Sequence, residues 1–133
     1  MSLFVDTSVW SLALRRDQAA DLPEVRRLVR ALESGETVVI TGLILQELLQ
    51  GFSGPKDREA ILQRLSVLPL LPPDRRDHIE AAQLRNLCRH RGVQIGMIDA
   101  LLGQLCLRHE LVMLSADDNF RHIAAHCRLM LWN

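Results

Sequence analysis

The sequence predicts an α/β fold, a three-layer α/β/α sandwich around a mainly parallel sheet of about four to five strands. Short apolar runs rich in β-branched residues alternate with longer segments of helical period, which is the pattern of β-α units. The 133 residues are 48% hydrophobic and 24% charged, an ordinary composition for a folded domain, with no internal repeat or linker. We therefore expect one domain over residues 1–133.

The strands and the later helices follow from the order of these runs. Residues 97–107 are apolar nearly all round, so they should form a buried helix, and residues 118–125 should form the last one. A long helix is expected from Asp74, as its cap, to about His90, with Gly92 closing it. The predicted strands are residues 3–5, 37–41, 67–71, 111–115 and 129–132.

Capping residues mark the starts of the earlier helices. Asp21 is expected to cap a helix that Gly35 ends, with Glu24 completing a capping box. Thr41 can cap a second helix that runs to residue 51, and Asp57 a third.

Charge and cysteine content exclude several classes of function. The 16 basic and 16 acidic residues give a net charge of zero, so any contact with nucleic acid must be local. Three cysteines without C-x-x-C spacing indicate neither a disulfide framework nor a thiolate zinc site. No apolar run approaches the length of a membrane span, and the N-terminus lacks a basic leader region, so we expect a cytoplasmic protein that does not enter membranes.

Four carboxylates occupy positions that a packed core does not explain. Asp6 follows the first strand and Asp117 follows the strand at 111–115, so parallel strands place both at the same edge of the sheet. Glu47 and Asp99 lie on helices among apolar neighbours, with no lysine or arginine within one helical turn. Each acid alone could cap a helix or pair with a distant arginine. Four converging carboxylates would repel one another unless hard cations lay between them, and Mg²⁺ or Mn²⁺ suits oxygen ligands.

The segments that carry these acids resemble the PIN-domain ribonucleases and, among them, the VapC-type toxins of type II toxin–antitoxin pairs. The similar segments are V-D-T-S-V-W with Asp6, T-G-L-I-L-Q-E-L-L-Q-G with Glu47, G-V-Q-I-G-M-I-D-A-L-L-G with Asp99 and L-V-M-L-S-A-D-D-N-F with Asp117. The resemblance implies a PIN domain with one or two Mg²⁺ or Mn²⁺ ions, an RNA substrate, a VapB-like antitoxin partner and a homodimer. Leu70, Leu71 and residues 129–132 could supply an apolar dimer patch.

The resemblance also suggests roles for individual residues. Asp6, Asp99 and Asp117 are expected to hold the metal, while Glu47 orients the attacking water or binds a second ion; cleavage would leave 5′-phosphate and 3′-hydroxyl ends. Ser8 and Ser115 are expected to support the site. The family's last motif has the form T-x-D-x-D-F, whereas this chain has Asn119 in place of the second acid.

Cations near the site would have to hold the RNA backbone, and Arg15 and Arg16 follow the Asp6 segment closely enough to do so.

Other functions remain as alternatives. A catalytically weak or silent PIN-like module that binds RNA is compatible with the Asn119 departure. A receiver-like signalling domain is a weaker alternative, because Asp6 has no acidic neighbour and the only lysine is Lys56. His122 and His126 have the spacing of two zinc ligands, but without a third ligand at motif distance a solvated helix face is the simpler interpretation.

Overall fold

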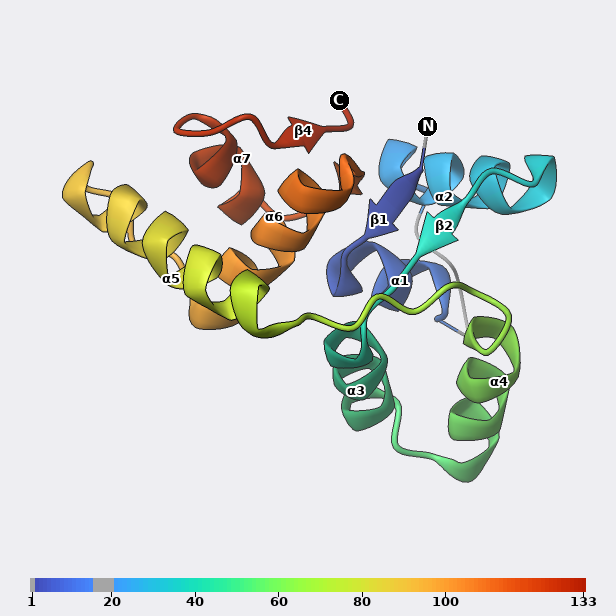
Figure 1. Ribbon diagram of the computed structural model, residues 1–133. Helices are drawn as coiled ribbons and strands as arrows, with labels where there is room; N and C mark the ends of the chain where they lie inside the picture. Colours follow the sequence, from blue (N-terminus) through green and yellow to red (C-terminus); the bar gives the residue numbers. More distant parts are fainter. Residues whose placement is uncertain (1, 16–20) are drawn as a thin grey trace.

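The computed structural model describes residues 2–15 and 21–133, and its centre is a parallel four-stranded sheet (Figure 1). The strands are β1 (Leu3–Val5), β2 (Val38–Val39), β3 (Val112–Leu114) and β4 (Met130–Leu131), in the order β2-β1-β3-β4. Leu3 is in register with Val38 on one side and with Val112 on the other. The predicted fold class is confirmed.

Helices cover both faces of this sheet. All residues of β1 and β3 are buried, as expected for parallel strands packed on both sides. In Figure 1, α5 and α6 lie on one side of the strands and α2 lies on the other. None of the helices in the described residues is long and apolar enough to cross a membrane. The helices are α1 (Thr7–Ala13), α2 (Pro23–Ser34), α3 (Gly42–Gly51), α4 (Pro55–Leu65), α5 (Arg75–His90), α6 (Met97–His109) and α7 (Asn119–Ala124).

The predicted strand at 67–71 is wrong. This segment makes only an isolated parallel bridge between Leu70 and Ile40. Ile40 N donates to Pro69 O at 3.0 Å and Leu71 N donates to Ile40 O at 2.8 Å. Pro69 has no N–H to extend a ladder, so the segment touches the edge of the sheet beside β2 and then leaves it.

Two predicted helix starts are also wrong. Leu22, rather than Asp21, is the N-cap of α2, and Gly54, rather than Asp57, is the N-cap of α4. Both helices have proline in the first turn, where its fixed φ and missing N–H are tolerated, and this sets the start without a side-chain cap. Asp21 instead forms an exposed ion pair with Arg26.

Three predicted helix ends hold, while the strands predicted at 37–41, 111–115 and 129–132 shorten to β2, β3 and β4. Thr41 caps α3 by accepting from Ile44 N at 3.3 Å. Asp74 caps α5 in a capping box with Asp77. Gly35 ends α2 with a φ of 77°, in the left-handed region that glycine adopts without strain.

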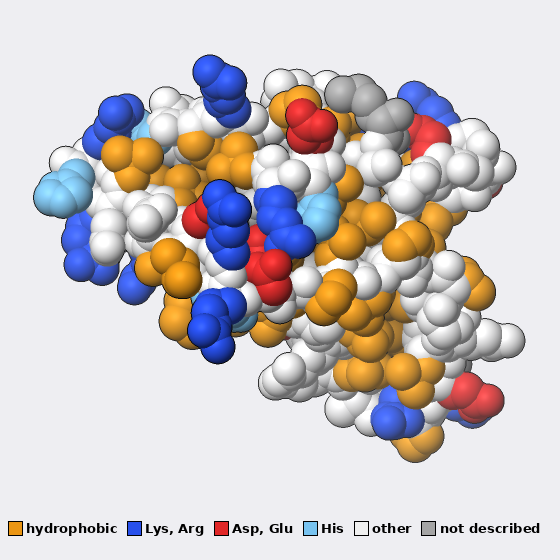
Figure 2. All heavy atoms as spheres, viewed as in Figure 1, with side chains coloured by type: hydrophobic (Ala, Val, Ile, Leu, Met, Phe, Trp, Pro, Cys, Tyr) orange, Lys and Arg blue, Asp and Glu red, His pale blue; other side chains and the backbone are white. Residues whose placement is uncertain are grey.

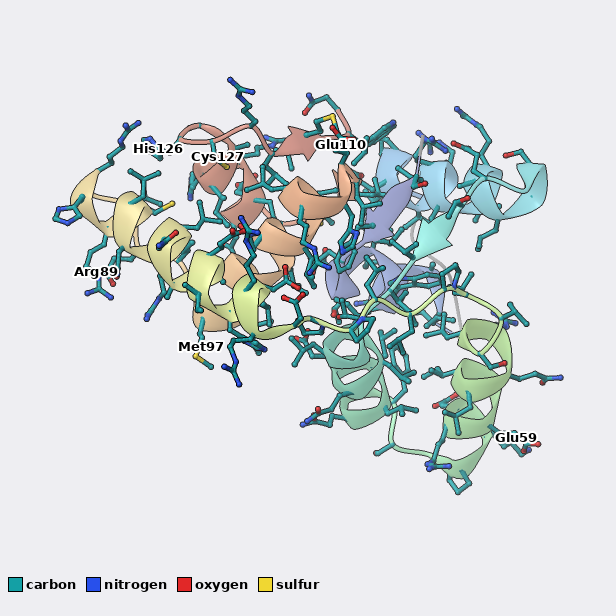
Figure 3. All side chains as sticks on the ribbon, viewed as in Figure 1. Glu59, Arg89, Met97, Glu110, His126 and Cys127 are labelled. Carbon is teal, nitrogen blue, oxygen red and sulfur yellow. The ribbon has the colours of Figure 1, made fainter. Side chains whose placement is uncertain are left out.

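The helix α6 is buried along its length but exposed where it begins. Residues 100–106 are all buried, as the sequence predicts, whereas Met97 is 75% exposed. Figure 3 shows the Met97 side chain projecting outward from the start of α6. Asp99 lies in this first, open turn.

Candidate functional site

Asp6 is held at the carboxyl end of β1 by two hydroxyl groups. It occupies the N-cap position of α1, yet its side chain makes no capping hydrogen bond. Its Oδ2 atom instead accepts from Ser8 Oγ at 2.8 Å and from Ser115 Oγ at 3.0 Å. The residue is only 6% exposed, so these donors offset part of the cost of removing a carboxylate from water.

The same serines join the ends of β1 and β3. Ser8 Oγ accepts from Ala116 N at 3.0 Å, and Ser115 Oγ accepts from Asp117 N at 3.0 Å. Asp6 N donates to Leu114 O at 2.9 Å. The backbone before Asp117 is therefore fixed to the Asp6 segment. Both serines predicted to support the site contact Asp6.

The carboxylates from distant parts of the chain interact electrostatically. Burial raises the pKa of Asp99, and the carboxylates of Asp6, Asp117 and Glu47 raise it further, while a hydrogen bond from Asn119 opposes them. Burial and the negative charge of Asp6 also raise the pKa of Asp117. A carboxyl on α6 thus responds to acids at the ends of β1 and β3 and on α3. The structure brings all four predicted acids to one edge of the sheet.

Glu47 is joined to the Asp6 segment by a contact that the sequence did not reveal. Thr7 Oγ1 donates to Glu47 Oε1 at 3.1 Å. Thr7 directly follows Asp6, and its hydroxyl was a signal that could have indicated a supporting role.

Asn119 contacts the site directly. Its Nδ2 donates to Asp99 Oδ2 at 3.2 Å, so the amide that departs from the family motif holds one of the acids. An acid at this position could not donate this bond when ionised.

The four candidate acids have no cationic partner in the described part of the chain. Among the described residues, no lysine or arginine forms an ion pair with Asp6, Glu47, Asp99 or Asp117. By contrast, Arg121 Nη1 lies 3.6 Å from Asp118 Oδ1, which sets Asp118 apart from its neighbour. The alternative that arginines neutralise each candidate acid is therefore not what the described part of the chain shows.

The donor set fits a hard cation in its chemistry, although the carboxylates do not form a closed ligand set. All four side chains supply oxygen ligands, as Mg²⁺ and Mn²⁺ prefer. In residues 2–15 and 21–133, no three His, Cys, Asp or Glu side chains are grouped closely enough to constitute a metal site. The acids are thus near enough for their charges to raise the pKa values of Asp99 and Asp117, and they are still separated from one another.

Arg15, one of the two predicted RNA-binding arginines, is not brought to these acids. Arg15 is exposed and lines a hollow between α1 and α4 together with Lys56 and Arg64, and none of the four candidate acids lines this hollow. Arg16 lies outside the described residues. Figure 2 shows other arginines interspersed with carboxylates over α5, and hydrophobic side chains over α3 and α4.

The two histidines considered as zinc ligands lie elsewhere. His122 is exposed and His126 is partly exposed, and Arg91 Nη1 lies 3.5 Å from His126 Nδ1, between the ends of α5 and α7. Figure 3 shows His126 beside that end of α5. This position agrees with a solvated face.

Comparison with known proteins identifies the family. The family model of the PIN domain matches residues 3–126. This chain belongs to the PIN domain family. The match covers β1, β3 and all four candidate acids, and membership in this family excludes the receiver-like alternative.

Solved structures share the fold of this PIN domain. One is FitAB bound to a DNA fragment, at 23% identity and a TM-score of 0.77, covering 100% of this chain and 94% of that chain. A second is VapBC2 from Rickettsia felis bound to promoter DNA, at 20% identity and a TM-score of 0.75, covering 100% of this chain and 98% of that chain. A third is VapC20 from Mycobacterium tuberculosis, described as a sarcin-ricin loop cleaving toxin, at 21% identity and a TM-score of 0.67, covering 96% of this chain and 98% of that chain. No curated protein sequence matches this PIN domain.

Proposed function

We propose that this protein is a metal-dependent endoribonuclease that acts as the toxin of a type II toxin–antitoxin pair. One observation carries the proposal: the pKa of Asp99 is raised by burial and by three carboxylates from separate elements of the fold. Such repulsion is costly to a protein that only needs to fold, and it is common at sites where charge is used. The PIN family model supports the same function.

Asp6, Asp99 and Asp117 would hold Mg²⁺ or Mn²⁺, and Glu47 would orient the attacking water or contribute to a second ion. When bound, the cation would supply Lewis-acid stabilisation of the phosphate and lower the pKa of water. It would also relieve the repulsion between an RNA phosphate and the acids.

The surrounding side chains set the orientation of these acids. Ser8 and Ser115 both donate to one oxygen of Asp6, Thr7 holds one oxygen of Glu47, and Asn119 holds one oxygen of Asp99. Asp6, Glu47 and Asp99 thus keep a defined direction. In-line attack at the phosphate would leave 5′-phosphate and 3′-hydroxyl ends.

The expected partners follow from the relatives. The FitAB and VapBC structures are named as complexes, and a VapB-like antitoxin is the partner that we propose for this chain. We also propose that the protein forms a homodimer and works in the cytoplasm.

The test compares wild-type protein with Asp6→Asn and Asp99→Asn on total cellular RNA. New 5′ ends are mapped with Mg²⁺, with Mn²⁺ and with chelator, and Asp118→Asn is the matched control because its carboxylate pairs with Arg121. Discrete 5′-phosphate ends should need metal, Asp6 and Asp99, and should persist in the control.

If the Asp6→Asn variant cleaved RNA at the wild-type rate, this mechanism would be contradicted. If the wild-type protein bound RNA but did not cleave it, the result would favour the catalytically silent RNA-binding module. The observation that favours this alternative is Asn119 in place of the second acid of the family motif.

A further inference from the structure

A pocket of about 240 Å³ opens directly beside the candidate site. It lies between the start of α2, the ends of β3 and β4, and α7. Two of its lining residues, Ser115 and Asp117, belong to the site itself, and Ser115 Oγ donates to Asp6 Oδ2. The pocket is therefore continuous with the place where the phosphate would react.

An aromatic residue also lines this pocket. Trp132 lines the pocket, and its backbone N donates to Met113 O at 3.0 Å, on the strand that leads to Ser115. Its side chain is partly exposed, whereas Trp10 is 3% exposed and Phe4 and Phe120 are fully buried. An aromatic side chain that lines a pocket and is partly exposed on an anchored backbone can serve as a platform on which a nucleobase stacks.

Charge and size both favour a base over a phosphate. Glu24 and Asp117 place carboxylates on the lining and Arg121 adds a single guanidinium, which is paired with Asp118 at 3.6 Å. This balance repels a phosphate but leaves an uncharged ring unaffected. The volume is below the roughly 300–1,000 Å³ of pockets that hold drug-sized ligands, so it suits one planar ring system.

We propose that this pocket binds one unpaired RNA base next to the cleaved phosphate, stacked on Trp132. The proposal rests on the proposed ribonuclease function of the same site and names its substrate more closely. A base can enter only when it is unstacked, so the substrate is single-stranded or looped RNA at the position of the cut. Trp132 is a specificity residue here and takes no part in the chemistry.

The first test needs neither metal nor cleavage. Adenosine carries a base without a phosphate, and it is titrated into the wild-type protein while the indole N–H signals of the two tryptophans are followed by NMR. The Trp132 signal should shift with saturation, and the signal of buried Trp10 is the internal control. Assignment comes from Trp132→Phe, which removes one signal.

The second test uses the cleavage assay. Trp132→Leu keeps an apolar side chain without a ring and should raise KM about ten-fold, the order expected for losing one base–aromatic stack, with kcat little changed. Trp132→Phe keeps a stacking ring and should return KM to within about three-fold of wild type. The base preference beside the cut should weaken in Trp132→Leu and persist in Trp132→Phe.

The two tests separate failure of this inference from failure of the proposed function. If the wild-type protein cuts RNA but Trp132→Leu has unchanged KM and cut sites, and adenosine leaves the Trp132 signal in place, the base pocket is refuted. If the wild-type protein cuts nothing, the ribonuclease function fails, while the adenosine titration on wild-type protein still decides whether the pocket binds a base.

Discussion

Replacing Ser115 by alanine should destabilise the protein through the buried carboxylate of Asp6. The change removes a donor 3.0 Å from Asp6 Oδ2 and an acceptor 3.0 Å from Asp117 N. A hydrogen bond to a charged group contributes about 1.5–3 kcal/mol. Because Asp6 keeps the Ser8 donor, the free energy of unfolding should fall by about 2 kcal/mol. With a urea m-value of about 2 kcal/mol/M, the unfolding midpoint should fall by about 1 M.

The matched control is Ser66→Ala, which removes an exposed hydroxyl that donates to Gln63 O, and should cost less than about 0.5 kcal/mol. Repeating Ser115→Ala in an Asp6→Asn background tests the charge itself. Because charge-assisted hydrogen bonds are about twice as strong as neutral ones, the loss should be about halved there. Equal losses in both backgrounds, or a loss no larger than that of the control, would refute the role assigned to Ser115.

Three further predictions concern other residues of the fold and the site. In chelator, Asp99→Asn should raise the free energy of unfolding at neutral pH, because the pKa of Asp99 is raised in the folded state and its charge opposes folding. This gain in stability should shrink as pH falls through that raised pKa. Urea unfolding curves of both proteins at several pH values test the prediction, and a stability difference that stays constant with pH would contradict it. Arg108→Met should destabilise at least twice as much as the exposed control Arg76→Met, because Asp77 is fully buried and Arg108 is its cationic partner. Although burial alone would raise the pKa of Asp77, its hydrogen bonds to Arg108 and Asp74 lower it, so this stabilisation should be present above the ordinary Asp pKa and lost as pH falls through the lowered value; denaturation midpoints of both variants against pH test this. Thr7→Val should lower kcat about ten-fold at unchanged KM by freeing Glu47, and a rise in KM alone would contradict a role in orientation.

The central strands and the position of the acids could be predicted from the sequence. β1 and β3 are wholly apolar and buried on both faces, so composition alone marked them. Asp6 comes directly after β1 and Asp117 comes three residues after the end of β3, and because the two strands pair in parallel, both acids lie at the same edge of the sheet. The prediction of a strand at 67–71 was wrong because one proline in the segment outweighs its apolar pattern.

The short helix α1 was missed for a different reason. Its seven residues include β-branched and hydroxyl side chains, which have low helix propensity. Tertiary packing supplies what propensity lacks, since Val9 and Trp10 are buried in the core. The contacts of Thr7 and Asn119 could not be predicted from the sequence either, because each depends on where a helix from a distant part of the chain lies in the fold.

The pairing of Leu3 with Val112 has a consequence for the order in which the candidate site is assembled during synthesis. β1 is made before its partner β3, which leaves the ribosome only after α6, and Asp117 follows later still. Non-local pairing of this kind has a high contact order and forms slowly. The four acids can thus come together only after the segment that carries Asp117 has been made, so a partly made chain holds Asp6 without the other acids of the proposed ribonuclease site.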